Sequence, residues 1–319
     1  MIGLLLCWYI LVAAQVTGWS PDEHKVIRSG RDEGRFLSSY GVVHTMLSDI
    51  EPECAFRPDM SKREFSKWQK KVRKSMQEIM NFPKRQDNSS VPKCIHTVQR
   101  DGYQLEKWEY YPLSGCVSTF LVLIPDSLVK PSPAILCIPG SGGSKEGLAG
   151  EPGITAKFDD DYRNPKVTMA LNFAKAGYIA VAVDNPAAGE AADLERYVRG
   201  RNYNYDLFSR FLLEMGWSYL GYTAYLDMQV LEWMKSRPYI RKDRIVVSGF
   251  SLGTEPLMVL GVLDPSIYAF VYNDFLCQTQ ERALVMTAPD KNGTRIFPNS
   301  IRHLIPNFWR KFNFPDIVA

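Results

Sequence analysis

The residues of this chain best suited to covalent chemistry stand in one short stretch, Gly249-Phe250-Ser251-Leu252-Gly253. The pattern Gly-x-Ser-x-Gly is typical of a serine at a sharp turn from a strand into a helix. Such a turn lifts the hydroxyl above the sheet and places the N-terminus of the next helix beneath it. The two glycines are needed because side chains at those positions would clash in the turn. The pattern therefore indicates a nucleophilic serine at position 251.

The segments on both sides of Ser251 fit that interpretation. The run 244–248 is rich in β-branched residues, as expected of a buried strand, and the run after Leu252 has the composition of a helix. The pentapeptide alone is a weak signal, because a purely structural turn could carry the same glycines. The strand before the serine and the helix after it favour the nucleophile.

A serine that attacks an acyl group also needs hydrogen-bond donors for the oxyanion that forms. One expected donor is the backbone amide of Leu252, and the second comes from the loop after an earlier strand. The glycine-rich segment CIPGSGGSKEG, residues 137–147, is placed for that role, with the Ser141 amide as the donor. The alternative is a phosphate-binding loop. The segment lacks Gly-Lys-Ser/Thr at P-loop spacing, and it contains no Gly-x-Gly-x-x-Gly.

The spacing of apolar residues changes along the chain, and it predicts the strands and helices that must position these residues. After residue 93, three strand-like runs are separated by short turns, which predicts antiparallel neighbours. Buried apolar runs and amphipathic runs then alternate, as in a three-layer α/β fold whose mostly parallel sheet is flanked by helices. The predicted strands are 94–100, 103–111, 116–125, 133–140, 178–190, 244–251 and 268–275, the predicted helices are 166–177 and 219–237, and 189–217 is an aromatic-rich insertion.

Ligands of such sheets bind at the carboxyl ends of the strands. In this chain those ends carry glycines and polar residues, at 139–141, 184–185, 249–251 and 273–274. The predicted nucleophile and the predicted donor loop therefore meet at one edge of the sheet.

The sequence resembles the α/β-hydrolases, and within them the branch of acetyl xylan esterases and dienelactone-hydrolase-like enzymes. The resemblance covers about residues 94–319 and is carried by PAILCIPGSGGSKEGLAGEPG, GYIAVAVDNPAAGEA, RIVVSGFSLGTEP and YAFVYNDFLCQTQERA. It implies ester hydrolysis through an acyl-serine at Ser251, without a metal or organic cofactor. Peptidases of the prolyl-oligopeptidase type usually carry another glycine after the turn, whereas Thr254 stands here, which favours an esterase.

The remaining members of a catalytic triad are harder to find. The resemblance implies the order serine, acid, histidine, with the last two residues after later strands. After Ser251 the sequence contains one histidine, His303, and one acid at a predicted strand end, Asp274. We expect that the last two strands of the fold are missing from this sequence, and that the segment 268–275 forms an exposed apolar edge. His303 as the base and Asp274 as the acid are the candidates that remain, and an inactive chain is the alternative.

The expected substrate is a small ester or an acetylated carbohydrate. Two alternatives stay open: a serine peptidase of the prolyl-oligopeptidase type, and a carbohydrate-binding relative without catalysis. The second is suggested by aromatic residues that could stack on sugars or could be helix core. They are Tyr203, Tyr205, Trp217, Tyr219 and Tyr222.

The N-terminus and the composition limit location and partners. Residues 2–14 are apolar but too few to span a bilayer, and small residues follow. Residues 1–18 are therefore predicted to be a signal peptide of a secreted or periplasmic protein, with a buried helix or an anchor as the alternative. No later segment predicts a membrane span in the mature chain. A net charge of +3 argues against a nucleic-acid partner, and the cysteine spacing matches no metal or haem motif.

The domain organisation follows from these segments. After the signal peptide, residues 19–92 are predicted to be an N-terminal helical extension, and residues 93–319 an α/β-hydrolase domain that is incomplete at its C-terminus. The extension contains a capping box of Ser61 and Glu64, which predicts the start of a helix. The oligomeric state is not indicated by the sequence.

Overall fold

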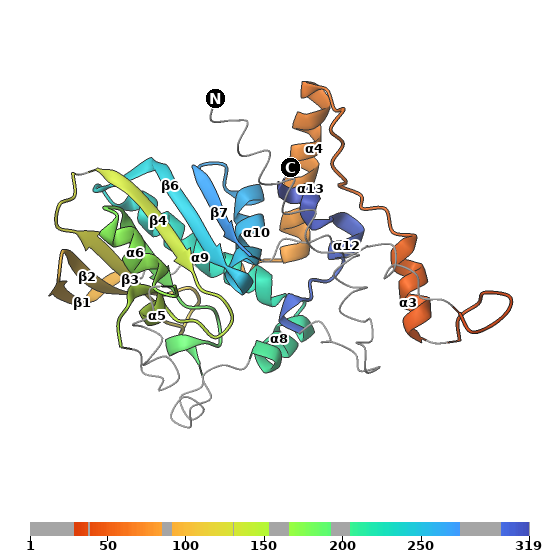
Figure 1. Ribbon diagram of the computed structural model, residues 1–319, viewed down its shortest axis with the longest axis horizontal. Helices are drawn as coiled ribbons and strands as arrows, with labels where there is room; N and C mark the ends of the chain where they lie inside the picture. Colours follow the sequence, from red (N-terminus) through yellow and green to blue (C-terminus); the bar gives the residue numbers. More distant parts are fainter. Residues whose placement is uncertain are drawn as a thin grey trace. The chain divides into compact units, whose positions relative to one another are not determined.

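The structure is a computed structural model that describes residues 29–37, 39–84, 91–129, 131–152, 166–192, 205–274 and 301–318 (Figure 1). The predicted signal peptide, residues 1–18, lies outside them. The chain divides into two compact units, Met1–Glu51 with Cys277–Asn299 and Pro52–Leu276 with Ser300–Ala319. In the first unit the structure describes one helix, α3 (Ser39–Ser48). No helix in the described part of the chain has the length and apolarity needed to cross a membrane.

The second unit is built on a seven-stranded sheet in the order β1-β2-β3-β5-β4-β6-β7. The strands β1 to β3 and β5 are antiparallel neighbours, whereas β5, β4, β6 and β7 run parallel. The seven predicted strands and the mixed sheet are therefore confirmed. Their bounds are β1 (Lys93–Arg100), β2 (Tyr103–Tyr110), β3 (Ser118–Pro125), β4 (Ser132–Ile138), β5 (Ile179–Val183), β6 (Ile240–Phe250) and β7 (Ala269–Asn273).

Helices cover both faces of the sheet. The central strands carry apolar side chains on both faces, and these side chains must be buried. Leu136 and Val181 lie in one core cluster with apolar residues of α9 and α10, while Ile135 and Ala180 lie in another with residues of α5 and α6. The predicted three-layer fold is therefore confirmed (Figure 1). These helices are α5 (Lys145–Ala149), α6 (Met169–Lys175), α9 (Tyr219–Ser236) and α10 (Glu255–Leu263).

The remaining helices of the second unit pack around this three-layer core. The predicted capping box is present at the start of α4 (Lys62–Met80), where Ser61 and Glu64 exchange hydrogen bonds. Val72 and Met76 on its apolar stripe are buried, in one core cluster with Met258 of α10. The predicted insertion contains a helix that the sequence pattern did not indicate, α8 (Tyr205–Glu214). The short elements are η3 (Gly189–Ala191), η4 (Ser251–Thr254), η5 (Ile301–His303), α12 (Phe308–Lys311) and α13 (Phe314–Val318).

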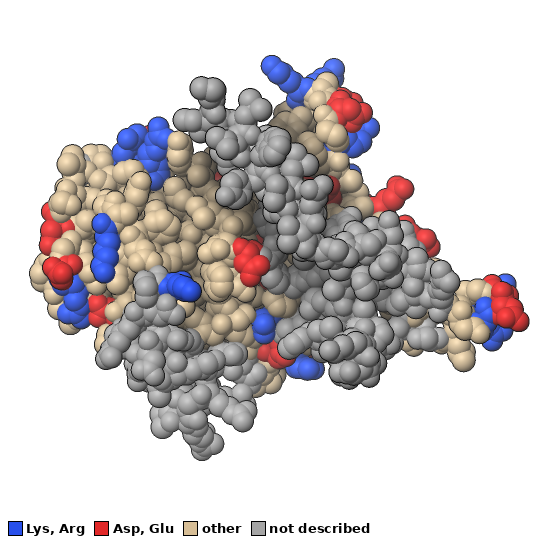
Figure 2. Space-filling model, in the orientation of Figure 1, with Lys and Arg blue, Asp and Glu red and all other residues tan. Residues whose placement is uncertain are grey.

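β7 is the last strand of the described sheet and pairs with β6 alone. Val271 in this strand is 43% exposed. Within the described residues, the expected apolar edge at 268–275 is therefore present over β7. On the face seen in Figure 2, the visible charged side chains of the described surface are of both signs and do not form one large basic patch.

Candidate active site

Ser251 lies where β6 turns sharply into η4 and α10. Its φ is +49°, a left-handed backbone conformation that few residues other than glycine adopt. The flanking glycines allow the turn by lacking a side chain. A Cβ at Gly249 would lie 2.1 Å from the carbonyl oxygen of Gly253, and a Cβ at Gly253 would lie 2.5 Å from that of Ile138. The strand, strained serine and helix thus have the form that Gly-x-Ser-x-Gly predicts, and the role of Ser251 as nucleophile stays a prediction.

The glycine-rich loop after β4 packs directly against this turn. A Cβ at Gly140 would lie 2.7 Å from the ring of Phe250, the residue before the serine. The closely packed Gly253 also approaches the carbonyl oxygens of Ile138 and Pro139. The start of the predicted donor loop and the turn of Ser251 are therefore backbone neighbours.

The amides of this loop are not all available to a substrate. Gly142 donates to the Tyr205 hydroxyl at 2.9 Å, Gly143 to the Gly140 carbonyl at 3.0 Å, and Lys145 to Asp184 Oδ1 at 2.8 Å. Between residues 141 and 145, the amides of Ser141 and Ser144 have no acceptor among the described residues. The geometry is thus compatible with the predicted use of Ser141 as an oxyanion donor.

Leu252, the other predicted donor, stands in the first turn of η4, directly after the serine. The first amides of a helix have no acceptor within the helix, which is why they serve as anion donors. The side chain of Leu252 is buried beside Tyr205 and Tyr219 and so keeps its backbone in place.

His303 lies in η5 and makes a close contact with a carboxylate. Its Nδ1 is 2.7 Å from Glu255 Oε1, and both side chains are buried. Glu255 is the first residue of α10, four positions after Ser251. A carboxylate on Nδ1 is the arrangement that orients a histidine base. No hydrogen bond joins His303 to Ser251 among the residues that the structure describes.

Asp274 follows β7 directly and has a φ of +79°. In the parallel register of β6 and β7, Phe250 is opposite Asn273, so Ser251 and Asp274 follow at equivalent ends of neighbouring strands. The structure thus brings the backbone of the predicted acid next to that of the predicted nucleophile. It also adds a second carboxylate, Glu255, which sequence reasoning missed. An acidic residue in the first turn of a helix is so common that it carried no signal there.

Two further residues contact the loop that carries Ser141: Arg302, which the sequence analysis did not single out, and Tyr205, which it named only as a residue that could stack on sugars. Arg302 Nη2 donates to Ser141 Oγ at 3.3 Å, and its guanidinium lies 5.2 Å from the centre of the Tyr205 ring. Tyr205 in turn holds Gly142 through its hydroxyl. Only the fold brings Arg302 of η5 to the loop after β4.

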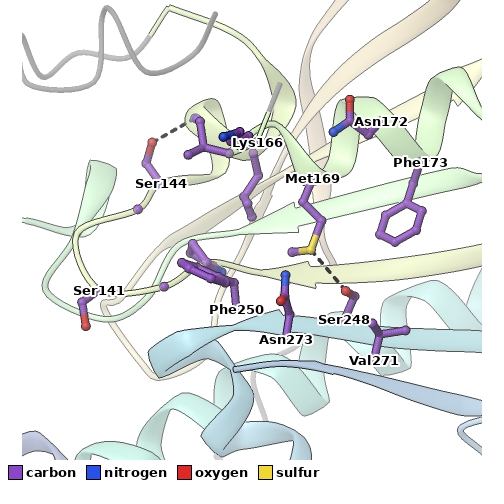
Figure 3. Close-up of a pocket in the computed structure, with 16 residues that line it drawn as sticks. Ser141, Ser144, Lys166, Met169, Asn172, Phe173, Ser248, Phe250, Val271 and Asn273 are labelled. Atoms are coloured by element: carbon purple, nitrogen blue, oxygen red, sulfur yellow. Dashed lines mark hydrogen bonds between the residues drawn. The ribbon is translucent and has the colours of Figure 1, made fainter. Parts of the chain in front are cut away.

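A pocket of about 720 Å³ lies beside this site (Figure 3). Its lining includes Ser141 of the donor loop, Met169 of α6, Phe250 of β6 and Asn273 of β7, whereas Ser251 and Leu252 do not line it. The Ser248 hydroxyl donates to the sulfur of Met169 at 3.1 Å across its wall. The pocket is therefore next to the serine turn rather than at it. Within the described residues, no group of three or more His, Cys, Asp or Glu side chains could hold a metal ion.

The sequence profile of the Abhydrolase family matches residues 18–319, which is most of the chain. The chain belongs to the α/β-hydrolase family. A crystal structure of a candidate acetyl xylan esterase from Bacteroides fragilis is 72% identical, with a TM-score of 0.85 over 94% of this chain and 77% of that chain. The expected resemblance and fold are thus confirmed, and these relatives support a hydrolase.

A more distant structure agrees with the fold. A glucuronoyl esterase from Solibacter usitatus is 12% identical, with a TM-score of 0.51 over 73% of this chain and 68% of that chain. At that identity the likeness concerns the fold alone. No curated protein matches the sequence.

Proposed function

We propose that this α/β-hydrolase is a serine carboxylic-ester hydrolase that removes acetyl groups from a carbohydrate. The observation that carries the proposal is the strained backbone of Ser251 at the carboxyl end of β6, with the loop of Ser141 packed against it. The 72% identity to a candidate acetyl xylan esterase supports the acetylated carbohydrate as the substrate class. A secreted or periplasmic location goes with that proposal, because residues 1–18 have the pattern of a signal peptide.

The proposed reaction has two halves. The Ser251 hydroxyl attacks the ester carbonyl carbon while a base takes its proton, and the amides of Leu252 and Ser141 donate to the oxyanion. The C–O bond to the alcohol then breaks, the alcohol takes the proton and leaves, and an acyl-serine remains. Water attacks this ester by the same route and releases acetate. Each oxyanion donor is worth about 10²–10³ in rate in comparable enzymes.

The base with a contact in the structure is His303, oriented by Glu255 at 2.7 Å. Asp274 is the alternative acid. Without a working base, Ser251 would stay a weak nucleophile, and the chain would show only the residual catalysis of the oxyanion donors.

The test is hydrolysis of p-nitrophenyl acetate by the chain and by Ser251→Ala. Turnover at ordinary enzyme rates that Ser251→Ala abolishes is expected, and equal background rates from both would contradict an active esterase. His303→Gln and Glu255→Gln should then lower kcat together, while Asp274→Asn should leave it near the wild-type value. A large loss of kcat in Asp274→Asn with little loss in Glu255→Gln would instead make Asp274 the acid.

The alternatives make different predictions. A peptidase would cleave peptide p-nitroanilides faster than acetyl esters. A carbohydrate-binding protein would bind sugars equally well after Ser251→Ala. Two of the aromatic residues that suggested stacking on sugars, Tyr205 and Tyr219, are each only 2% exposed and belong to the core, so the structure gives that alternative little support.

A further inference from the structure

Asp184 and Asn185 follow β5 and contact both ends of the loop that carries Ser141. At the start of the loop, Asn185 Nδ2 donates to the carbonyl oxygens of Pro139 and Gly140, at 2.8 and 3.2 Å. At its end, Asp184 accepts from the Lys145 backbone amide at 2.8 Å and from Lys145 Nζ at 2.7 Å. Two adjacent side chains directly after β5, the strand next to β4, thus hold both ends of the loop.

The side chain of Lys145 is fully buried among carboxylates. Besides Asp184, its Nζ lies 2.9 Å from Glu146 Oε1 and 2.8 Å from Glu190 Oε2. Burial works against the charge on Lys145, but the attraction of Asp184, Glu146 and Glu190 outweighs it and raises the pKa of Lys145. Lys145 therefore carries its positive charge at neutral pH.

The acidic side of this cluster is fixed to the sheet. Glu190 accepts from Lys107 of β2 at 2.7 Å and from Thr119 of β3 at 2.8 Å, and its own backbone amide donates to Asp184 at 3.3 Å. Gly189 allows this approach, because a Cβ there would lie 2.3 Å from Asp184 Oδ1. These contacts fix Glu190 relative to β2 and β3, and Lys107 and Thr119 do not themselves contact the loop.

A buried ion cluster is weak evidence for stability, because taking charges out of water costs about as much as their attraction returns. The cluster instead fixes the position of the loop that carries Ser141. An oxyanion donor acts only if it lies about 2.7–3.1 Å from the developing charge, so a free loop would lose its effect. Ser141 lies between the two points that Asn185 and Asp184 hold.

We propose that Asp184 and Asn185 are positioning residues that hold the loop 139–145 so that the Ser141 amide points at the oxyanion. The catalytic part of this inference rests on the proposed esterase function. The part that concerns the loop does not, because it can be measured without turnover.

The test compares the wild type with Asn185→Leu, which removes both hydrogen bonds at the start of the loop, and with Asp184→Ala and Asp184→Asn. Lys107→Met is the matched control, because Lys107 contacts Glu190 but not the loop. The first readout is hydrogen exchange of the Gly142 and Gly143 amides, which donate to the Tyr205 hydroxyl and to the Gly140 carbonyl in the folded protein. Exchange should rise at least about tenfold in Asn185→Leu and Asp184→Ala, while the amides of β4 stay protected. If Asn185→Leu does not fold, Asn185→Ala removes the same two bonds.

The second readout is chemistry at Ser251. In Asn185→Leu and Asp184→Ala, kcat for p-nitrophenyl acetate and the rate of Ser251 labelling by a phosphonate should fall about a hundredfold, with KM little changed. Asp184→Asn keeps an acceptor for the Lys145 amide and should recover part of the rate. Unchanged loop exchange in Asn185→Leu and Asp184→Ala, or equal losses in Lys107→Met, would overturn the inference. If wild-type Ser251 reacts with neither reagent, the esterase proposal falls, and the exchange data still decide whether the two residues hold the loop.

Discussion

Ser251 adopts a backbone conformation that serine disfavours, and the close packing of the neighbouring residues holds it there. The β6 strand ends at Phe250, η4 begins at Ser251, and the contacts of Gly249 and Gly253 leave no room to relax. Residues held at such φ values cost of order 1–3 kcal/mol and cluster at functional sites. The strain at Ser251 is thus a cost to folding that the proposed reaction would explain.

Replacing Ser251 by glycine should therefore stabilise the protein while it removes the proposed nucleophile. We expect Ser251→Gly to raise the free energy of unfolding by about 1 kcal/mol, because glycine adopts positive φ without a penalty. Ser251→Ala is the control, since alanine keeps the strain. Urea unfolding of the three proteins at pH 7 measures the difference. Equal stability of the glycine and alanine variants would mean that the backbone at 251 is not strained.

At the scale of elements, α9 packs against the sheet and carries an ionisable group on its buried side. Asp227 is 2% exposed, and its Oδ2 has no hydrogen-bond partner among the described residues. Burial raises the pKa of this carboxyl well above its ordinary value of 3.8. A group of this kind lowers stability as the pH rises above 3.8, because the unfolded chain ionises it and the folded chain resists ionisation.

Asp227→Asn should therefore be more stable than the wild type at pH 7. We expect a gain of about 1 kcal/mol or more, because asparagine, unlike aspartate, has no ionised form that favours the unfolded chain. The gain should shrink as the pH is lowered toward 3.8, because the unfolded aspartate then becomes increasingly protonated, as it is in the folded state. Urea unfolding from pH 4 to pH 7 tests this, and a pH-independent difference would show that ionisation of Asp227 does not matter.

β7 is an edge strand, because one of its edges has no strand beside it in the described sheet. Unpaired apolar edges invite association between molecules, and a lysine on the edge opposes it. Val271→Lys should reduce light scattering of concentrated protein severalfold. Val42→Lys on α3 is the control, since Val42 is similarly exposed at 45% but lies on a helix. Equal effects of both variants would point to net charge rather than to the strand edge.

At the scale of the whole sheet, charges link strands that are distant in sequence. Lys107 on β2, Glu190 after β5 and Lys145 after β4 form one chain of ion pairs. Burial alone would raise the pKa of Glu190, but Lys145, Lys107 and Thr119 outweigh it and lower this pKa to about 2. An acid with a lowered pKa stabilises the fold above its unfolded pKa, and this stabilisation is lost as the pH falls.

The contribution of Glu190 should therefore vanish between about pH 4.5, its ordinary pKa, and about pH 2. In that window the stability of the wild type should fall more steeply with acid than that of Glu190→Gln. Thermal unfolding at several pH values measures both slopes. Parallel curves for the two proteins would mean that Glu190 does not carry its charge in this network.

Much of this architecture was predictable because its causes are local. The capping box of Ser61 and Glu64 needs only neighbouring residues, and the strands of the central sheet are visible as short apolar runs. The strained turn at Ser251 follows from two glycines at fixed spacing. The start of β6 at Ile240, earlier than predicted, comes from its pairing with Ser132 of β4, which the exposed polar run 241–243 does not reveal.

The sequence by itself determined the α/β sandwich and the serine turn, since periodicity, caps and the steric demands of glycine act over a few residues. Only the tertiary structure decided which side chains surround that turn. His303 meets Glu255, Arg302 meets Ser141, and Asn185 holds Pro139 across large sequence separations. These contacts depend on strand order and on the path of α8 and η5, which no local pattern encodes.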